Sequence, residues 1–156
     1  MKPLPDAVKA YIAEANVCRI ATVRSDGTPH IVPVCPAFDG HRTLYVDVAK
    51  DGVTARALNQ SDRITAIIDE YNDDWSKLKA VIMRCRAEPL SDTGLEAAWV
   101  LFREKYPQGR AIGWTRLDGA AHARPADCRL DGVGSRPPAG VSAGVNQAQL
   151  RDRLNG

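Results

Sequence analysis

The sequence predicts a mainly β protein with flanking helices, an α+β class in which short antiparallel strands form a barrel. Two β-branched runs lie on either side of a polar turn within Val17–Val34, which is a strong hairpin signal. Further β-branched runs recur at Thr43–Val48, Arg63–Glu70 and Leu78–Ala87, with polar turns or loops between them. Apolar residues at helical spacing predict one helix before these runs and another after them.

The turn of the first hairpin ends in Asp26-Gly27, a pair that tolerates the positive φ angles of a tight turn. The run before it, Val17–Val23, is almost wholly apolar, so we expect both of its faces to be buried. The run after it contains Pro29 and Pro33, which cannot donate hydrogen bonds to a neighbouring strand. We therefore expect this second strand to be bulged or to lie at a sheet edge. It is either a wall for a flat ligand with a polar rim or an ordinary barrel hairpin.

Two amphipathic helices flank the predicted strands. The first covers residues 7–16 with Asp6 as its cap, and the second follows a cap at Ser91 or Asp92 and ends before Pro107. Each carries an apolar stripe at i, i+3, i+4 and i+7 spacing. The stripes consist of Val8, Tyr11, Ile12 and Ala15, and of Leu95, Ala98, Trp99 and Phe102.

The character of the chain changes after about residue 109. Residues 110–156 are rich in Arg, Ala, Gly, Pro and Asp, lack strong strand patterns and contain one helical hint at Asn146–Leu154. We therefore expect a folded domain over residues 1–108 and an atypical, poorly ordered tail over residues 109–156. Either a divergent end or a reading-frame slip would produce such a tail, and the barrel would keep an open edge.

The totals describe an ordinary globular domain. The chain has 156 residues, of which 44% are hydrophobic and 26% charged, and these values fit one domain with a real core. A net charge of +2 is too small to indicate a nucleic-acid partner. No apolar run is long enough to span a bilayer, and residues 1–6 lack an apolar signal core. We therefore expect a cytoplasmic protein without a membrane partner.

The cysteines and histidines are widely spaced along the chain. They are Cys18, Cys35, Cys85 and Cys128, and His30, His41 and His122. The cysteines form no Cys-x-x-Cys pair and mostly adjoin apolar runs, so they indicate small core residues rather than a disulfide framework. The histidines do not cluster with them in the sequence, so we predict no metal site.

Three polar residues follow the strand at residues 43–48. Lys50, Thr54 and Arg56 lie around the start of a short helical segment, Val53–Asn59. An ammonium group, a hydroxyl and a guanidinium near a helix start are groups that hold a phosphate, because backbone N–H groups also point outward there. The alternative, and the commoner situation, is that these side chains are simply solvated.

The order of elements and several motifs resemble a known family. The motifs are Arg19-Ile-Ala-Thr-Val, Asp26-Gly-x-Pro-His-Ile-Val-Pro-Val34, Leu44-Tyr-Val-Asp47 with Lys50, Arg63 to Asp69, Tyr71-Asn-Asp-Asp-Trp-Ser-x-Leu78, and Lys105-Tyr-Pro107. Over residues 7 to about 108 they are similar to the pyridoxamine 5'-phosphate oxidase-like flavin and deazaflavin split barrels. Asp-Asp-Trp with Lys-Tyr-Pro-Gln resembles a subgroup assigned to the deazaflavin coenzyme F-420.

The resemblance implies a six-stranded antiparallel split β-barrel of the FMN-binding type, usually a homodimer with the cofactor in a groove between subunits. It implies that Lys50 and Arg56 hold the cofactor phosphate, with Thr54 where many relatives have a second lysine. It also implies a ring along the second strand and an aromatic residue near the ring or the interface. These ring contacts are His30, Ile31, Val32 and Pro33, with Trp75 as the aromatic residue.

The function that the resemblance implies is hydride transfer between coenzyme F-420 and a small organic substrate. An FMN-dependent oxidoreductase and a split barrel that carries a cofactor or heme without turnover remain open alternatives. No catalytic residue is assigned, although His30 and Tyr71 are candidate proton donors, with strand and loop packing as the alternative roles. We expect a small-molecule substrate, a homodimer and no nucleic-acid partner, because the few aromatic residues fall mostly at predicted core positions.

Overall fold

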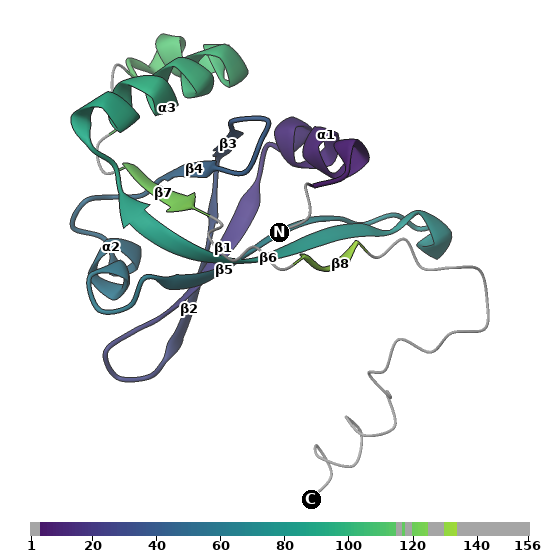
Figure 1. The fold of residues 1–156 in the computed structure, drawn as a ribbon, viewed down its shortest axis with the longest axis horizontal. Coiled ribbons are helices and arrows are strands. Elements are labelled where there is room, and N and C mark those ends of the chain that lie inside the picture. The colour runs from purple at the N-terminus through teal and green to yellow at the C-terminus, as the bar shows by residue number, and fades with distance from the viewer. Residues whose placement is uncertain (1–3, 115–116, 118–119, 125–129, 134–156) are drawn as a thin grey trace, which may run out of the picture.

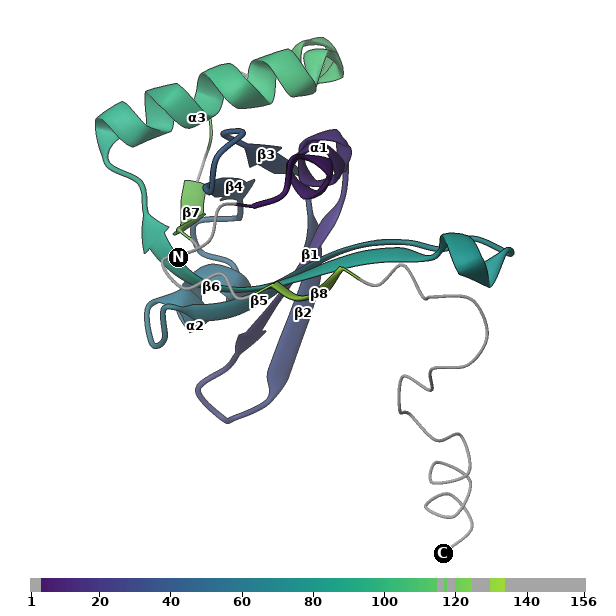
Figure 2. The same cartoon turned by 45° about the vertical axis from the view of Figure 1, so that its right-hand side comes forward.

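The structure is a computed structural model that describes residues 4–114, 117, 120–124 and 130–133. The helices are α1 (Asp6–Glu14), α2 (Val53–Leu58) and α3 (Asp92–Lys105), with the 3-10 helices η1 (Trp75–Lys77) and η2 (Pro107–Ile112). The strands are β1 (Cys18–Val23), β2 (Pro29–Val34), β3 (Pro36–Phe38), β4 (Leu44–Asp47), β5 (Arg63–Glu70), β6 (Lys79–Pro89), β7 (Ala120–Arg124) and β8 (Leu130–Val133). Figures 1 and 2 show α1 and α3 on one side of the strands and α2 on the other. The predicted mainly β class with flanking helices is confirmed.

The strands form one antiparallel path in the order β2-β1-β5-β6-β7-β4-β3, and β8 adds to β6. β2 ends at Val34 and β3 begins at Pro36, so Cys35 alone joins the two ends of the path. The sheet must therefore curve back on itself, as the strands of a barrel do. β2 lies at one end of the path formed by the described strands, so the edge position, one of the two alternatives predicted from its prolines, is confirmed.

The β1–β2 hairpin has the predicted turn. Gly27 adopts a φ of 81°, and the Thr28 backbone N–H donates to Asp26 Oδ1 at 2.9 Å. Only one face of β1 is buried, however, because Arg19 and Val23 point outward and are exposed. The expectation of two buried faces is therefore wrong. A strand in a barrel wall has an inner and an outer side, and the outer side of β1 lies on the surface.

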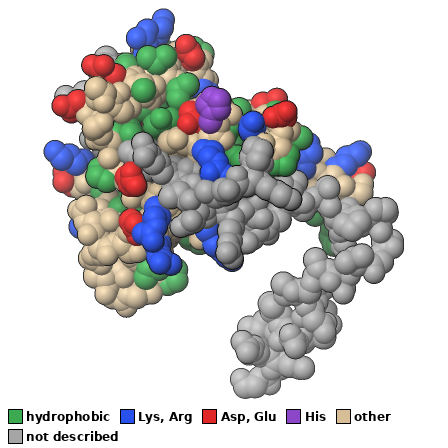
Figure 3. Space-filling view, in the orientation of Figure 1, with side chains coloured by type: hydrophobic (Ala, Val, Ile, Leu, Met, Phe, Trp, Pro, Cys, Tyr) green, Lys and Arg blue, Asp and Glu red, His purple; other side chains and the backbone are tan. Residues whose placement is uncertain are grey.

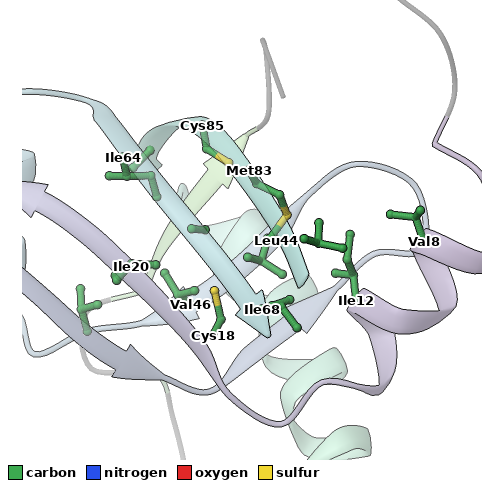
Figure 4. Close-up of a cluster of buried hydrophobic side chains, with 14 residues drawn as sticks. Val8, Ile12, Cys18, Ile20, Leu44, Val46, Ile64, Ile68, Met83 and Cys85 are labelled. Atoms are coloured by element: carbon green, nitrogen blue, oxygen red, sulfur yellow. The ribbon is translucent and has the colours of Figure 1, made fainter. Parts of the chain in front are cut away.

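The main core lies between the inner faces of the strands and α1. Alternate residues of β6 point inward, and α1 contributes its predicted stripe. Figure 4 shows these side chains gathered against those of β1, β4 and β5. The buried members are Val8, Ile12, Cys18, Ile20, Leu44, Val46, Val48, Ile64, Ala66, Ile68, Val81, Met83, Cys85 and Ala87.

A second, aromatic cluster fastens α3 to β3. The fully buried Phe102 ring lies 5.6 Å from the Trp114 ring and 6.0 Å from the Tyr106 ring. The Tyr106 hydroxyl donates to the Pro36 carbonyl oxygen at 2.8 Å. A Cβ on Gly109 would lie 2.5 Å from the Trp114 ring, so η2 needs a glycine where it passes this ring.

The helix starts differ in part from the predicted ones. α1 begins at Asp6 itself with Pro5 at the capping position, so the predicted Asp6 cap is wrong. The Asp6 carboxylate pairs instead with Lys9 at 3.1 Å, within its own first turn. α3 has one of its two predicted caps, Ser91, whose Oγ accepts the Gly94 N–H at 3.4 Å. Among the described residues, no helix combines the length and hydrophobicity needed to cross a bilayer.

Within the described part of the chain, two strands follow residue 109, where the sequence predicts none. β7 pairs with both β4 and β6, and β8 pairs with β6. The predicted lack of strands is wrong, and β7 covers the edge that was expected to stay open. β7 reads Ala-Ala-His-Ala-Arg, so its two partners, rather than β-branched residues, account for the strand. The predicted tail disorder beyond residue 133 and the predicted helix at Asn146–Leu154 lie outside the described residues.

The cysteines match the core prediction in part. Cys18 and Cys85 are buried, whereas Cys35 is exposed, because it occupies the joint between β2 and β3. Cys128 lies outside the described residues. Burial raises the pKa of the Cys18 thiol to about 12, so this sulfur stays protonated and unreactive at neutral pH.

We predict that Phe102→Ala destabilises the fold strongly. The side chain is fully buried in the aromatic cluster, and truncation there costs about 3–5 kcal/mol in free energy of unfolding. Urea denaturation measures this change. Val100→Ala, at a 53% exposed position of the same helix, is the control and should change stability by less than about 0.5 kcal/mol. Equal effects of the two substitutions would contradict the packing described here.

We also predict that Asp39 contributes to stability in a way that is lost in acid. Burial favours its neutral form, but hydrogen bonds from the backbone N–H groups of Thr43, His41 and Arg42 outweigh this and hold the Asp39 pKa below its ordinary 3.8. A lowered folded pKa means that the stabilisation is complete above pH 3.8 and disappears as pH falls through the folded pKa. Asp39→Asn should therefore flatten the fall in melting temperature below pH 4. An unchanged slope would refute this.

Candidate functional site

A direct contact between two predicted site residues joins β2 to α2. His30 Nε2 and Thr54 Oγ1 lie 3.2 Å apart, within hydrogen-bonding distance. Thr54 is buried and His30 is half-buried. α2 packs against β1 and β2, so it covers this end of the hairpin and brings the hydroxyl to the imidazole. The structure thus joins residues that are 24 positions apart in the chain.

The two predicted cations occupy exposed positions around the same turn. Lys50 lies in the turn before α2, and Arg56 lies on α2. The Arg56 guanidinium donates to the Asp51 backbone carbonyl at 2.5 Å, so it folds back over the loop that precedes the helix. A guanidinium carries five N–H donors, so this bond leaves others for an anion.

The predicted ring contacts on β2 belong to two different faces. His30 and Val32 are half-buried and lie opposite the buried Thr22 and Ile20 of β1. Ile31 and Pro33 lie on the outer face, where Ile31 is 64% exposed. A flat ring cannot lie on both faces of one strand. It can contact both sets only along the outer edge of β2, where the strand ends the sheet path.

Trp75 lies far from this contact within one chain. It begins η1 at the tip of the β5–β6 hairpin, which projects from the body on the side opposite α2 (Figures 1 and 2). Trp75 is 58% exposed and Tyr71, on the same tip, is 73% exposed. The structure therefore does not bring Trp75 together with His30 and Thr54.

Thr22 is a site neighbour that the sequence analysis missed. It is 4% exposed, and its hydroxyl has no hydrogen-bond partner within the part of the chain that the structure describes. Its register partner across the hairpin is His30. A buried polar group without a partner costs about 1–3 kcal/mol, so it calls for an explanation. The sequence offers only a weak signal for it, a hydroxyl within a largely apolar run, and a threonine there is an ordinary strand residue.

The Lys105-Tyr106 pair carries part of the family resemblance but binds backbone. Lys105 Nζ donates to the Ala15 carbonyl at 2.6 Å, and Tyr106 bonds to Pro36 as described above. Burial lowers the pKa of Lys105 and raises that of Tyr106. These two side chains therefore anchor the end of α3 to the loop after α1 and to β3.

The donors among the predicted site residues His30, Thr54, Lys50 and Arg56 fit an anionic group. They comprise an imidazole, a hydroxyl, an ammonium group and a guanidinium, which together suit a phosphate. The described residues contain no cluster of His, Cys, Asp and Glu that could hold a metal ion. On the face seen in Figure 3, acidic and basic side chains are interspersed, unlike the continuous basic stripe of a nucleic-acid interface.

Comparison with known proteins gives a family match and several structural neighbours. The family model for pyridoxamine 5'-phosphate oxidase matches residues 4–124. No curated protein sequence matches the chain significantly. Conserved hypothetical protein Rv2991 from Mycobacterium tuberculosis is 16% identical with a TM-score of 0.67, and the match covers 93% of this chain and 99% of that one.

Two further neighbours are proteins named for heme. The heme binding protein from Mycobacterium smegmatis is 18% identical with a TM-score of 0.61, over 80% of this chain and 52% of that one. HutZ, the heme storage protein from Vibrio cholerae, is 14% identical with a TM-score of 0.59, over 84% and 92%. The chain spans about half the length of two matched structures, 55% of one and 52% of the M. smegmatis protein. At these identities the likeness shows the fold alone.

The residues matched by the family model run from α1 to the end of β7 and include both segments of the His30–Thr54 contact. The structural neighbours share this fold, so the predicted antiparallel split-barrel fold is confirmed, although the described residues form eight strands and not the expected six. The chain belongs to the pyridoxamine 5'-phosphate oxidase family.

Proposed function

We propose that this protein is an oxidoreductase that binds coenzyme F-420 and transfers a hydride between it and a small organic substrate. FMN is the alternative cofactor. The observation that carries the proposal is the His30–Thr54 contact. This contact joins β2 to α2. The resemblance assigns the cofactor ring to β2 and the cofactor phosphate to α2 and the loop before it. Family membership supports a flavin-type cofactor in general.

In this proposal the phosphate end of the cofactor binds to Thr54, Lys50 and Arg56, beside the His30 imidazole. These groups supply charge-assisted hydrogen bonds, which are about twice as strong as neutral ones. The ring lies along the outer edge of β2, against Val32 and Pro33. The bound cofactor supplies hydride transfer at its ring, while the protein holds the anionic end, orients the ring and excludes water.

A second copy of the chain completes the proposed site. The outer face of the β1–β2 hairpin exposes neighbouring apolar residues, among them Val23 at 54% and Ile31 at 64%. Exposed apolar residues grouped in this way are typical of an interface. Trp75 lies too far from α2 of its own chain to contact the site there. In a homodimer through this face, the projecting β5–β6 hairpin of one copy can bring Trp75 to the site of the other copy.

Heme binding without turnover is the second candidate function. Two structural neighbours are named for heme, and His30 is a half-buried imidazole at the candidate site. A neutral imidazole nitrogen is a common iron ligand. Heme ligation would compete with the His30–Thr54 contact, because Nε2 would turn from the hydroxyl to the metal.

Titration of the purified protein separates the two functions. Coenzyme F-420 and FMN are followed by fluorescence quenching, and hemin by its absorption band. We expect tight binding of F-420, with FMN binding more weakly or not at all. Hemin binding alone would replace the proposal with the heme candidate, and a folded protein that binds none of the three would overturn both.

We predict that Arg56→Ala weakens cofactor binding while the fold is retained. Arg56 is exposed, and loss of one charge-assisted contact to phosphate lowers affinity roughly 10- to 100-fold. Titration of the variant measures the affinity, and thermal unfolding checks the fold. Arg103→Ala, at an exposed position on α3, is the control with the same change of charge. An affinity equal to that of Arg103→Ala would exclude Arg56 from the site.

We predict that Ile31→Glu dissociates the proposed homodimer. A carboxylate in an apolar interface loses hydration without gaining a partner, so association should weaken at least 10-fold. Analytical ultracentrifugation over a concentration series measures the dissociation constant. Val100→Glu places the same charge at a 53% exposed position on α3 and should leave association unchanged. A monomeric wild-type protein would refute the dimer altogether.

A further inference from the structure

Thr22 is a buried residue that lies opposite His30 in the β1–β2 hairpin. Register partners in an antiparallel pair hold their Cβ atoms about 4.5–5.5 Å apart, and both side chains of such a pair lie on the same face of the sheet. Thr22 and His30 are partners of this kind between β1 and β2. The His30 side chain is therefore the neighbour of Thr22 on the same face of the hairpin, while its Nε2 lies 3.2 Å from Thr54 Oγ1.

The two hydroxyls differ in their hydrogen bonding. Thr54 Oγ1 lies 3.2 Å from His30 Nε2, whereas Thr22 Oγ1 is buried and has no partner among the described residues. One imidazole nitrogen cannot bond well to both at once. The second ring nitrogen, Nδ1, does not pair with Thr22 in this orientation, because Thr22 Oγ1 has no hydrogen-bond partner among the described residues. A ligand atom that bonds to Thr54 would release His30 to turn to Thr22.

We propose that Thr22 is a positioning residue for the anion site, and this inference rests on the proposed function of that site. In the free protein His30 bonds to Thr54. When an anionic group binds Thr54, His30 turns to Thr22, and all three side chains are then paired. Binding thus satisfies a hydroxyl that the ligand never touches, so Thr22 contributes to affinity through His30.

The ligand arm of the test compares Thr22→Val with Thr22→Ser. Valine keeps the shape and removes the unpaired hydroxyl, so the urea midpoint of the free protein should rise while affinity for F-420 or FMN falls roughly 3- to 10-fold. Serine keeps the hydroxyl and should restore the affinity to within about 2-fold. Thr65→Val, a half-buried threonine on the outer side of β5, is the control and should change neither quantity. Unchanged affinity in Thr22→Val would overturn the proposal.

The second arm needs no ligand and tests the His30 exchange itself. Thr54→Val in the wild-type background should cost little stability, because His30 can rebond to Thr22. The same substitution in the Thr22→Val background should lower stability more, because His30 then loses both partners. The double variant should therefore have a lower urea midpoint than the sum of the two single effects predicts. The 15N shifts of the His30 ring should move in Thr54→Val but return toward an unbonded value in the double variant.

The two arms separate failure of the inference from failure of the proposed function. Additive urea midpoints would overturn the role of Thr22, whatever the cofactor results. If no cofactor binds the wild-type protein but the midpoints are non-additive, the proposed function fails while the exchange of His30 between Thr22 and Thr54 stands.

Discussion

β6 holds the two halves of the barrel together by pairing along both of its edges. It pairs with β5 over most of its length, with β8 near Val81 and with β7 from Arg86 to Pro89. β7 continues to β4 and β3, so the part of the sheet that carries the aromatic cluster connects to the hairpin part through this one long strand. Burial of alternate β6 residues, from Val81 to Ala87, adds the apolar contacts that keep it in place.

The elements that could be predicted are those with a local signal. β5 has the predicted bounds, because a β-branched run between polar loops needs no tertiary information. β3 and β7 lack such a signal, since one has three residues and begins with Pro36 and the other is mostly alanine. Pairing with β4 accounts for both strands. Whether such segments form strands depends on partner strands that are distant in the sequence, and the local residue pattern carries no information about these partners.

The site residues also divide into those that the sequence predicts and those that only the structure identifies. His30 and Thr54 could be named from motif order, and the structure adds the distance between them, which depends on how α2 packs on the hairpin. Neighbouring residues of a strand alternate between its two faces, so a prediction of β2 as a strand implies this split, but the structure was needed to show that His30 and Val32 are on the half-buried face. Thr22 stayed hidden because a threonine within an apolar run is an ordinary strand former. Only its burial opposite His30 distinguishes it.

The tip of the β5–β6 hairpin is ordered by its own short-range bonds. Asp74 accepts the Ser76 N–H at 3.1 Å and the Ser76 hydroxyl at 2.7 Å, and Asn72 accepts the Asp74 N–H at 2.9 Å. Ordering a loop is one of the main entropic costs of association. Here the hydrogen bonds already order the tip in the free protein. A surface that bound this tip would therefore bury the exposed aromatic side chains of Tyr71 and Trp75 without the entropic cost of ordering a flexible loop.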